Sequence, residues 1–456
     1  MPGDRARRTI KAKRRSKSKV QVPTDAVTRR IVGARSANEN ATVTSDAAEG
    51  QVGSNAWNPT GLKRNALSHA FGTVHLGATF YYPSGAWSLD AVATRSGYPC
   101  RISGYYPGRG CFSSPLAAAN FGTATTDAAQ GVRGRLSYDG GTHRVLVQVH
   151  SFNGRTAANN HPVRGGNSTI AQIEVEAAIM EGAATGTALF NDGLNATVPG
   201  VTWDDKFDAI GDALNAYTDN MLRRTMIRPW HEMTGGWYRW GCILPNNFTT
   251  STAQTRALEA RLQAAYRGMW QRFHDRVSAR LGTRASMLKW VFNVAGNINL
   301  VRAQDAAVNC YPGDAYVDVI TLDHYCEGAN SVADVTGSVN WMDDFLADHP
   351  KPTGVDESGP HDNFTSTANN EDDYPLWGEV IRDWCESHRT NPNTGLSHFI
   401  DYEIDADGNA IRLFRDRTQP MVNRVDPNIW SSTMNGQTWQ NNHPLLTTWM
   451  ATAFDD

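Results

Sequence analysis

Val317-Asp318-Val319-Ile320-Thr321-Leu322 is a short run that is apolar on both faces, and Val145-Leu146-Val147-Gln148-Val149 is a second one. Runs of this kind are typical of parallel strands that are buried beneath helices on both faces of a sheet. Together with six further runs they give eight predicted strands, at residues 74–81, 101–106, 144–152, 225–230, 287–294, 316–322, 352–356 and 396–404.

Amphipathic segments lie between these strands and predict helices. Residues 206–222, 257–280 and 374–387 place apolar side chains at helical spacing. Alternating strands and helices predict βα units, and eight such units close a barrel. The predicted fold class is therefore α/β, a single (β/α)8 TIM barrel with loop insertions, the longest of them between residues 153 and 224.

The beginning of the chain has a different composition. Residues 1–30 hold eleven Lys and Arg against two Asp, and the stretch to residue 55 is rich in small and polar residues. Such a composition is typical of disorder. We expect a disordered basic leader at 1–55 that is dispensable for activity, and a folded domain at 56–456 with a C-terminal extension from 406. Arg7-Arg8 is not followed by an apolar segment, so no secretory signal is predicted.

Composition also excludes several classes of protein. The net charge of the 456 residues is -3 and the chain beyond the leader is acidic, which disfavours nucleic-acid binding because phosphates need clustered positive charge. No window approaches 18 unbroken apolar residues, so no membrane span is predicted. The six cysteines include no CxxC pair, which excludes a zinc ribbon, and Cys100 and Cys111 flank a Gly/Pro-rich loop and could form a disulfide.

The densest motif is the stretch from Ile227 to Gly241, which reads IRPWHEMTGGWYRWG and follows the fourth predicted strand. Active sites of barrels lie at the C-terminal ends of the strands. A zinc-binding HExxH motif would need His at position 235, where the chain has Gly235, so no metal site is predicted here. A carboxyl among aromatic rings tends to have a raised pKa, which makes Glu232 a candidate proton donor.

A second carboxylate follows about three βα units later. The stretch KPTGVDESGP at residues 351–360 reads as a short strand that ends in acidic residues before a turn. Two carboxylates that face each other across a barrel mouth are the machinery of glycoside hydrolysis, which makes Glu357 the candidate partner of Glu232. Asp356 is the rival, and strand alternation predicts that its side chain points away from the site.

The sixth strand supplies further candidates. Asp318 lies within the predicted strand, which favours a structural role, whereas Asp323 and Tyr325 follow it and should lie at the rim of the barrel. A tyrosine beside a nucleophilic carboxylate can donate a hydrogen bond that orients it.

These stretches resemble the family 26 glycoside hydrolases, chiefly endo-β-1,4-mannanases, over residues 73–405. His231-Glu232 with Met233, Gly235, Trp237 and Trp240 is similar to the strand-four motif of the family. Residues 311–325 and the run Lys289-Trp290-Val291-Phe292-Asn293 are similar to its strand-six and strand-five motifs. The chain departs from the pattern at Thr234, where Asn is usual and where a substrate contact would change.

The resemblance implies a role for each matching residue. Glu232 is similar to the acid/base, Glu357 to the nucleophile and Tyr325 to the residue that supports the nucleophile. His231 and Trp237 resemble substrate-site residues. Three further site candidates are His150, as a sugar-binding or core histidine, Trp240, as a stacking platform or core residue, and Arg228, as an orienting partner of the carboxylates. Tyr402 and Trp430 are candidates for the aromatic subsite residue of the family.

The resemblance therefore implies a retaining endo-acting hydrolase of β-1,4-mannan. The same mechanism on β-1,3-xylan, a mixed-linkage β-glucan or a bacterial surface glycan is an alternative, and a non-catalytic carbohydrate-binding or virion structural barrel is another. The expected partner is a polysaccharide, with no nucleic acid, membrane, metal or cofactor, and the expected state is a monomer. No secretory signal is recognised in the sequence, but the expected site of action is outside the cell or on a virion.

Overall fold

The computed structural model describes fourteen parts of the chain. They are residues 75–80, 102–105, 132–136, 144–152, 164, 168–193, 197–245, 253–326, 331–360, 373–389, 391, 393–404, 433–434 and 437–438. All of them belong to the second of the two units into which the chain divides, Val52–Asp456. The predicted leader, the Cys100–Cys111 pair and Trp430 lie outside the described residues.

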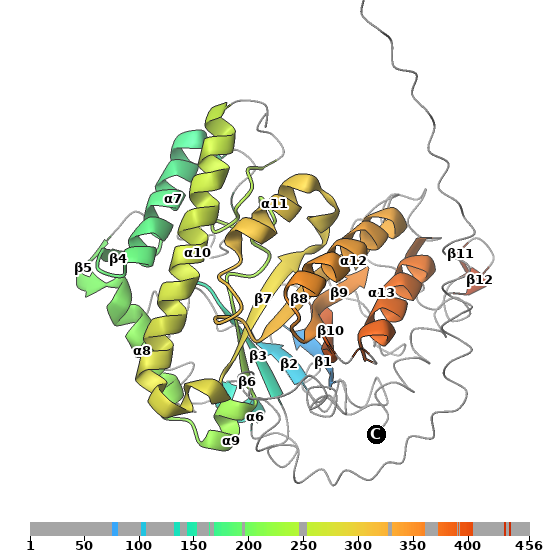
Figure 1. Ribbon diagram of the computed structural model, residues 1–456, viewed down its shortest axis with the longest axis horizontal. Coiled ribbons are helices and arrows are strands. Elements are labelled where there is room, and N and C mark those ends of the chain that lie inside the picture. The colour runs from blue at the N-terminus through green and yellow to red at the C-terminus, as the bar shows by residue number, and fades with distance from the viewer. Residues whose placement is uncertain are drawn as a thin grey trace, which may run out of the picture. The chain divides into compact units, whose positions relative to one another are not determined.

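Eight parallel strands close a barrel in the order β1-β10-β9-β8-β7-β6-β3-β2 (Figure 1). The strands are β1 (His75–Phe80), β2 (Ile102–Tyr105), β3 (Arg144–Val149), β6 (Thr225–Pro229), β7 (Lys289–Ala295), β8 (Val319–Cys326), β9 (Thr353–Pro360) and β10 (Leu396–Ile404). Each corresponds to one of the eight predicted strands, and the predicted (β/α)8 barrel is confirmed. Strand β8 begins three residues later and ends four residues later than predicted, so Asp323 and Tyr325 lie inside the strand.

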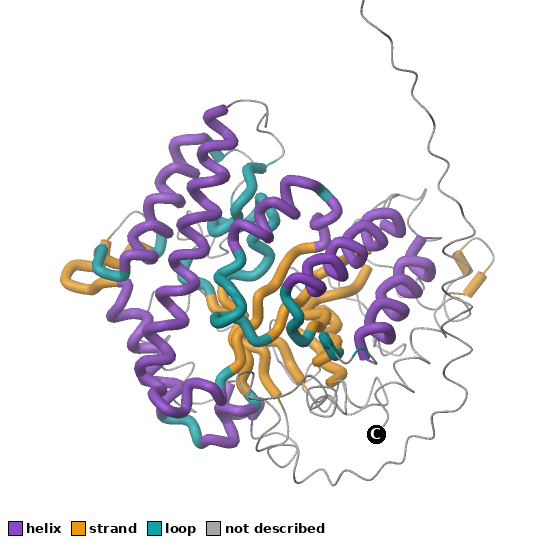
Figure 2. The backbone as a smooth tube through the Cα atoms, viewed as in Figure 1, coloured by secondary structure: helices purple, strands orange, loops and turns teal. Residues whose placement is uncertain are grey.

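Helices pack outside the strands (Figure 2). They are α6 (Val132–Leu136), α7 (Ile170–Thr185), α8 (Trp203–Asn215), α9 (Asp219–Arg223), α10 (Ala253–Leu281), α11 (Val301–Cys310), α12 (Ser331–Asp348) and α13 (Asp373–Arg389). The helix predicted at 206–222 is split into α8 and α9, and those predicted at 257–280 and 374–387 are α10 and α13. Helices α6, α7, α11 and α12 were not predicted. None of the described helices is long and apolar enough to cross a membrane.

Short elements complete the described chain. A hairpin of β4 (Leu189–Asn191) and β5 (Thr197–Thr202) lies in the long insertion between β3 and β6. The 3-10 helices η3 (Gly282–Met287) and η4 (Gly296–Asn299) flank β7, and β11 (Thr433–Met434) pairs with β12 (Gln437–Thr438).

Helices α8 and α10 run parallel and are tied by a regular row of ion pairs. Arg272 binds Asp204, Arg276 binds Asp208 and Arg280 binds Asp212. Both partners advance by four residues, the spacing of one helix face. This row lies over a core of large aromatic side chains, of which Trp203, Trp230, Trp270 and Phe273 are fully buried.

The interior of the barrel is layered, and the layers position the site. The lowest described layer is apolar and consists of Ile102, Leu146, Met226, Val291 and Val319. Because inward-facing residues of a strand recur every second position, the next layer is formed by Gln148, Arg228, Asn293 and Thr321, which are all buried. The barrel is thus apolar at the level of the first layer and polar one layer closer to the C-terminal ends of the strands.

Candidate active site

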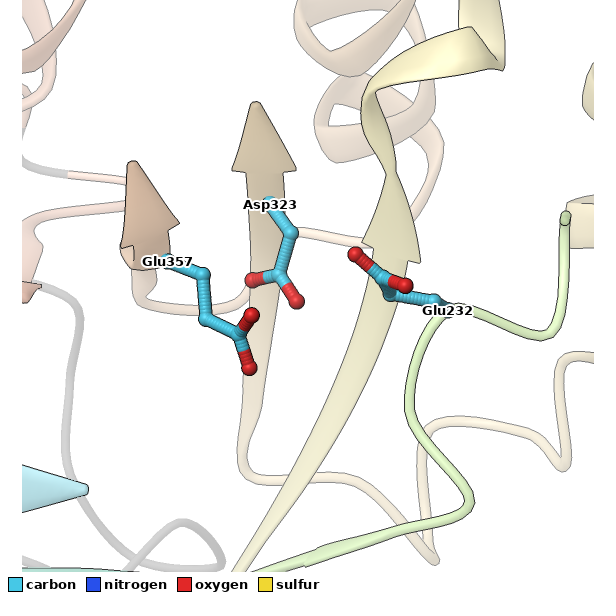
Figure 3. A group of neighbouring side chains, drawn as sticks. All are labelled: Glu232, Asp323 and Glu357. Carbon is cyan, nitrogen blue, oxygen red and sulfur yellow. The ribbon is translucent and has the colours of Figure 1, made fainter. Parts of the chain in front are cut away.

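Three carboxylates converge at the C-terminal mouth of the barrel (Figure 3). Glu232 follows β6, Asp323 lies on β8 and Glu357 lies on β9. One oxygen of each lies within 4.8 Å of the other two, and all three residues are buried. Carboxylate oxygens at this spacing could hold a cation, but two of the three already bind the guanidinium of Arg228.

The loop that carries Glu232 has an unusual backbone. Trp230 has φ 45° and Glu232 has φ 53°, a left-handed conformation that costs about 1–3 kcal/mol for a non-glycine residue and tends to occur at functional sites. The Trp230 amide donates to Val149 O, and the Trp230 indole donates to Ser151 Oγ. Since strand alternation is broken at Trp230, its ring packs among Phe207, Tyr266 and Phe273 outside the barrel, and Glu232 is left at the mouth.

Glu232 is fixed by two contacts. Its amide donates to Asn293 Oδ1 at 3.1 Å, and its carboxylate Oε2 accepts a hydrogen bond from Trp237 Nε1 at 2.7 Å. The indole of Trp237 folds back over Gly235, where any Cβ would lie 2.4 Å from the ring. Trp237 is 38% exposed, so it can contact a ligand as well as Glu232.

The aromatic residues beside Glu232 form a stack. Trp240 is fully buried, with Tyr238 stacked at 4.5 Å and His150 stacked at 5.4 Å between ring centroids. Its indole N–H donates to His231 O, and His231 Nε2 lies 3.0 Å from the Tyr238 hydroxyl. The interpretation of Trp240 as a stacking platform for sugar is therefore wrong, because the ring is sealed inside the protein. Trp240 instead supports His150, His231 and Tyr238.

A network of buried ion pairs anchors the loop that follows Glu232. Arg164 and Arg239 both bind Glu176, which is fully buried on α7. Arg164 also donates to the carbonyl oxygens of Gly236, Ile243 and Gly241, and its amide contacts Trp237 O. The loop is thus held by its own carbonyl groups, which a guanidinium with its five donors can bind at several points.

Glu357 has a different environment. Both of its carboxylate oxygens are bound: Oε2 accepts from the Tyr325 hydroxyl at 2.7 Å, and Oε1 accepts from Arg228 Nη2. Arg228 also donates from Nη1 to both oxygens of Asp323, at 3.1 and 2.9 Å, and from Nε to Gln148 Oε1. The structure thus brings Tyr325 and Arg228 into contact with Glu357, and the roles predicted for them stay predictions.

Asp323 is held among charges. It is fully buried and also accepts from Asn293 Nδ2 at 2.8 Å. Burial raises the pKa of Asp323 well above its usual range, and the neighbouring carboxylates of Glu357 and Glu232 raise it further, while Arg228 opposes them. Asp323 therefore keeps a proton to higher pH than an exposed aspartate does.

Asp356 does not point away from the site, contrary to the expectation from strand alternation. Its Oδ2 accepts from Thr321 Oγ1 at 2.5 Å and lies 3.5 Å from Arg228 Nη1. The cause is a β-bulge: Leu322 pairs with Val355, but Asp323 pairs with Glu357, so one extra residue is accommodated on β9. A bulge allows consecutive side chains to face the same side.

Three further positions were named from the sequence: Thr234, Asp318 and Tyr402. Thr234 is fully buried and its hydroxyl accepts from the Ala295 amide at 2.9 Å, so this departure from the family pattern joins the loop to β7. Asp318 precedes β8 and accepts from the Trp290 amide, in agreement with a structural role. The side chain of Tyr402 lies outside the described residues.

Sequence reasoning missed part of the site. Gln148, Thr321 and His398 were not singled out, and Asn293 was named only within a motif. The signal was present, because each is a polar residue at an inward position of a predicted strand, where apolar residues would otherwise fill the barrel. Cys242, Cys310 and Cys385 are free and buried among the described residues.

Comparisons with known proteins point to one family of glycoside hydrolases. Residues 195–351 match the model of glycosyl hydrolase family 26. This range includes Glu232, Asp323 and Tyr325 and ends before Glu357. The resemblance noted from the sequence is confirmed over this range, which is similar to the model of that family.

Two relatives match by sequence. The mannan endo-1,4-beta-mannosidase A and B of Caldalkalibacillus mannanilyticus is 31% identical over 187 residues, 41% of this chain and 30% of that protein. The mannan endo-1,4-beta-mannosidase of Bacillus subtilis is 27% identical over 188 residues, 41% of this chain and 43% of that protein. The matches thus span less than half the length of either relative.

A solved structure shares the fold. The catalytic domain of the family 26 endo-β-1,4-mannanase from Bacillus sp. JAMB-750 aligns over 86% of this chain and 89% of that chain, with a TM-score of 0.50 and 14% identity. At this identity the likeness concerns the barrel fold alone.

Proposed function

We propose that this chain, which is similar to glycoside hydrolase family 26 over residues 195–351, is a retaining endo-acting hydrolase of β-1,4-mannosidic bonds in mannan-type polysaccharides. The observation that carries the proposal is the approach of Glu232 and Glu357, whose nearest oxygens lie within 4.8 Å at the barrel mouth. Retaining enzymes hold their two carboxyl groups about 5–5.5 Å apart, whereas inverting ones leave about 6.5–9.5 Å for a water molecule.

Glu357 is the proposed nucleophile. Its carboxylate attacks the anomeric carbon while the bond from that carbon to the departing sugar oxygen breaks, which leaves an α-linked glycosyl ester on Glu357. Tyr325 and Arg228 each bind one of its oxygens. These donors hold the carboxylate in one orientation, which favours attack because the reacting atoms need a fixed geometry.

Glu232 is the proposed proton donor. An indole N–H can only donate, so Trp237 Nε1 donates to Oε2 of Glu232 and orients the carboxyl group that supplies the proton. That proton passes to the departing oxygen. In the second step the Glu232 carboxylate takes a proton from water, the oxygen of that water attacks the anomeric carbon, and Glu357 is released with a β-configured product.

Substrate contacts in the proposal come from the residues around the acid. Trp237 is partly exposed beside Glu232 and offers an aromatic face to a sugar ring. His231 is buried but lies directly before Glu232 and is oriented by Tyr238. The preference for mannan is supported by the names of the two relatives, which are mannan endo-1,4-beta-mannosidases.

The test is a panel of linear β-1,4-mannan, β-1,3-xylan, mixed-linkage β-glucan and bacterial surface glycans, with product analysis and NMR of the first product formed. We expect internal cleavage of mannan and a β-anomer at early times. Cleavage of another glycan alone would replace the substrate, an initial α-anomer would refute retention, and binding without cleavage would favour a non-catalytic barrel. Glu357→Gln serves as the matched inactive control.

A further inference from the structure

Asp356 and His398 form a fully buried pair beneath the proposed nucleophile. His398 Nε2 lies 2.5 Å from Asp356 Oδ1, and neither side chain is exposed. The other oxygen of Asp356, Oδ2, contacts Thr321 Oγ1, Asn293 Nδ2 and Arg228 Nη1 at 2.5, 3.3 and 3.5 Å. The hydrolysis described above assigns no role to this pair.

The backbone is arranged to form the pair. Alternation from Gly354, which pairs with the inward Thr321, directs Asp356 inward, and the bulge on β9 brings the next residue, Glu357, to the same side. Gly354 pairs with His398 across β9 and β10, and a Cβ at Gly354 would lie 3.0 Å from the imidazole atoms Cε1 and Nε2. A glycine therefore leaves the space that the imidazole occupies. On its other side the ring is held by Ser397 Oγ, 3.0 Å from Nδ1.

The charges explain why such a pair is useful. One guanidinium, that of Arg228, contacts the three carboxylates of Asp323, Asp356 and Glu357. Burial raises the pKa of Asp356, but the hydrogen bond to His398 and the charge of Arg228 outweigh burial and lower it overall. Asp356 is therefore an ionised group that lies 3.5 Å from Arg228 Nη1 and only 2.5 Å from the imidazole of His398.

We propose that Asp356 and His398 are positioning residues for the nucleophile. His398 fixes one oxygen of Asp356, the other oxygen holds Nη1 of Arg228 together with Asp323, and Nη2 is thereby directed to Glu357. The pair acts on the reaction through Arg228 and does not touch substrate. This inference rests on the proposed function, because it assigns Glu357 the attacking role.

The first test measures how fast Glu357 is glycosylated in the full chain. The probes are a dinitrophenyl β-mannobioside, which needs no proton donor, and a 2-deoxy-2-fluoro mannobiosyl fluoride, which traps the ester. Asp356→Asn should lower kcat/KM and the trapping rate by about 30-fold, as a misplaced reacting group does, with KM within about threefold. Asp318→Asn, which alters an aspartate before β8, is the matched control and should leave both rates unchanged.

The second test uses His398 and stands even if the Asp356 variant does not fold. His398→Gln keeps an N–H donor for Asp356 and should retain the trapping rate within about threefold, whereas His398→Ala removes the donor and should lower it by tenfold or more, in the direction of Asp356→Asn. The inference would be overturned if Asp356→Asn and His398→Ala were trapped as fast as Asp318→Asn and showed only a lower Tm. Loss of trapping in the unmodified chain would instead refute the proposed function.

Discussion

Glu232 and Glu357 face each other at the barrel mouth, but the surroundings that hold them differ. Glu232 stands on a left-handed loop among aromatic rings, with an indole N–H on one oxygen. Glu357 stands on a bulged strand among charges, with a phenol and a guanidinium on its two oxygens. Different surroundings are how two carboxyl groups take on different chemical roles.

Each side also depends on a buried arginine, and the two arginines bind different partners. Arg164 binds Glu176 and several carbonyl groups, so it sets the shape of the loop beyond Glu232. Arg228 binds three carboxylates, so it sets the charge and orientation around Glu357. The proposed acid is thus positioned by the shape of its loop, and the proposed nucleophile by the charges around it.

The largest effect should come from removing the carboxyl on the acid side. Glu232→Ala should reduce hydrolysis of mannan by about 10²–10⁴, since general acid catalysis contributes about this much. Glycosylation by a dinitrophenyl mannoside should fall far less, because its leaving group needs no proton. Steady-state rates on both substrates check this, and equal losses on both would reject Glu232 as the proton donor.

Removing the charge on the nucleophile side should have the next largest effect. Arg228→Met leaves buried carboxylates without their cation, which costs about 3–5 kcal/mol of unfolding free energy, and both mannan and the dinitrophenyl substrate should react about 10³-fold more slowly. Arg228→Lys keeps the positive charge but loses the planar, forked guanidinium, so its rates should lie between those of the wild type and Arg228→Met. Kinetics and urea unfolding check this. A loss confined to mannan would place Arg228 on the acid side.

His324, which follows Asp323 on β8, should make the fold sensitive to acid. Burial lowers the pKa of His324 to about 4, although its backbone hydrogen bonds oppose this, and its Nδ1 accepts from Trp377 Nε1. Above about pH 6.5 the imidazole is neutral in both the folded and the unfolded chain. Between about 6.5 and 4 only the unfolded chain takes up the proton, so stability should fall by up to about 3 kcal/mol.

His324→Asn tests this, because its amide oxygen can accept from Trp377 and does not titrate. Urea unfolding at several pH values should give a wild-type free energy that decreases towards acid relative to the variant. Parallel curves for the two proteins would show that His324 is not responsible.

The smallest effect should come from one hydrogen bond on the acid side. Trp237→Phe keeps a ring over Gly235 but removes the donor to Glu232 Oε2. A hydrogen bond to a charged group contributes about 1.5–3 kcal/mol, so kcat/KM on mannan should fall by at least about tenfold and the dinitrophenyl substrate should be affected less. An unchanged pH profile and rate would show that this contact does not serve the acid.

The barrel could be predicted from the sequence because its strands are apolar on both faces and occur at regular intervals. Four of the described helices, α6, α7, α11 and α12, could not be predicted in this way, and α7 shows why. Its Val175 is exposed and its Glu176 is fully buried, since Arg164 and Arg239 bind the carboxylate. Because of these contacts a charged residue of α7 faces the core and an apolar residue faces solvent, and the sequence of the helix alone does not reveal this.

Within the site, Glu232 could be predicted from its aromatic neighbours and Glu357 from its spacing. That Asp356 and Glu357 both face the interior of the barrel could not be predicted, because a bulge is a property of the paired backbones and leaves no mark in VDES. The burial of Trp240 was also beyond the sequence, since it depends on His150 and Tyr238, which the fold brings to its two sides.

The most direct measurement is the configuration of the glycosyl azide formed by two alanine variants with an activated β-mannoside and added azide. Glu357→Ala opens the face of the sugar that the nucleophile occupied, so azide should attack there and give the α-glycosyl azide. Glu232→Ala still forms the ester on Glu357, and azide then replaces water on the opposite face to give the β-glycosyl azide. The reverse assignment of the two anomers, or the same anomer from both variants, would contradict the roles proposed for Glu232 and Glu357.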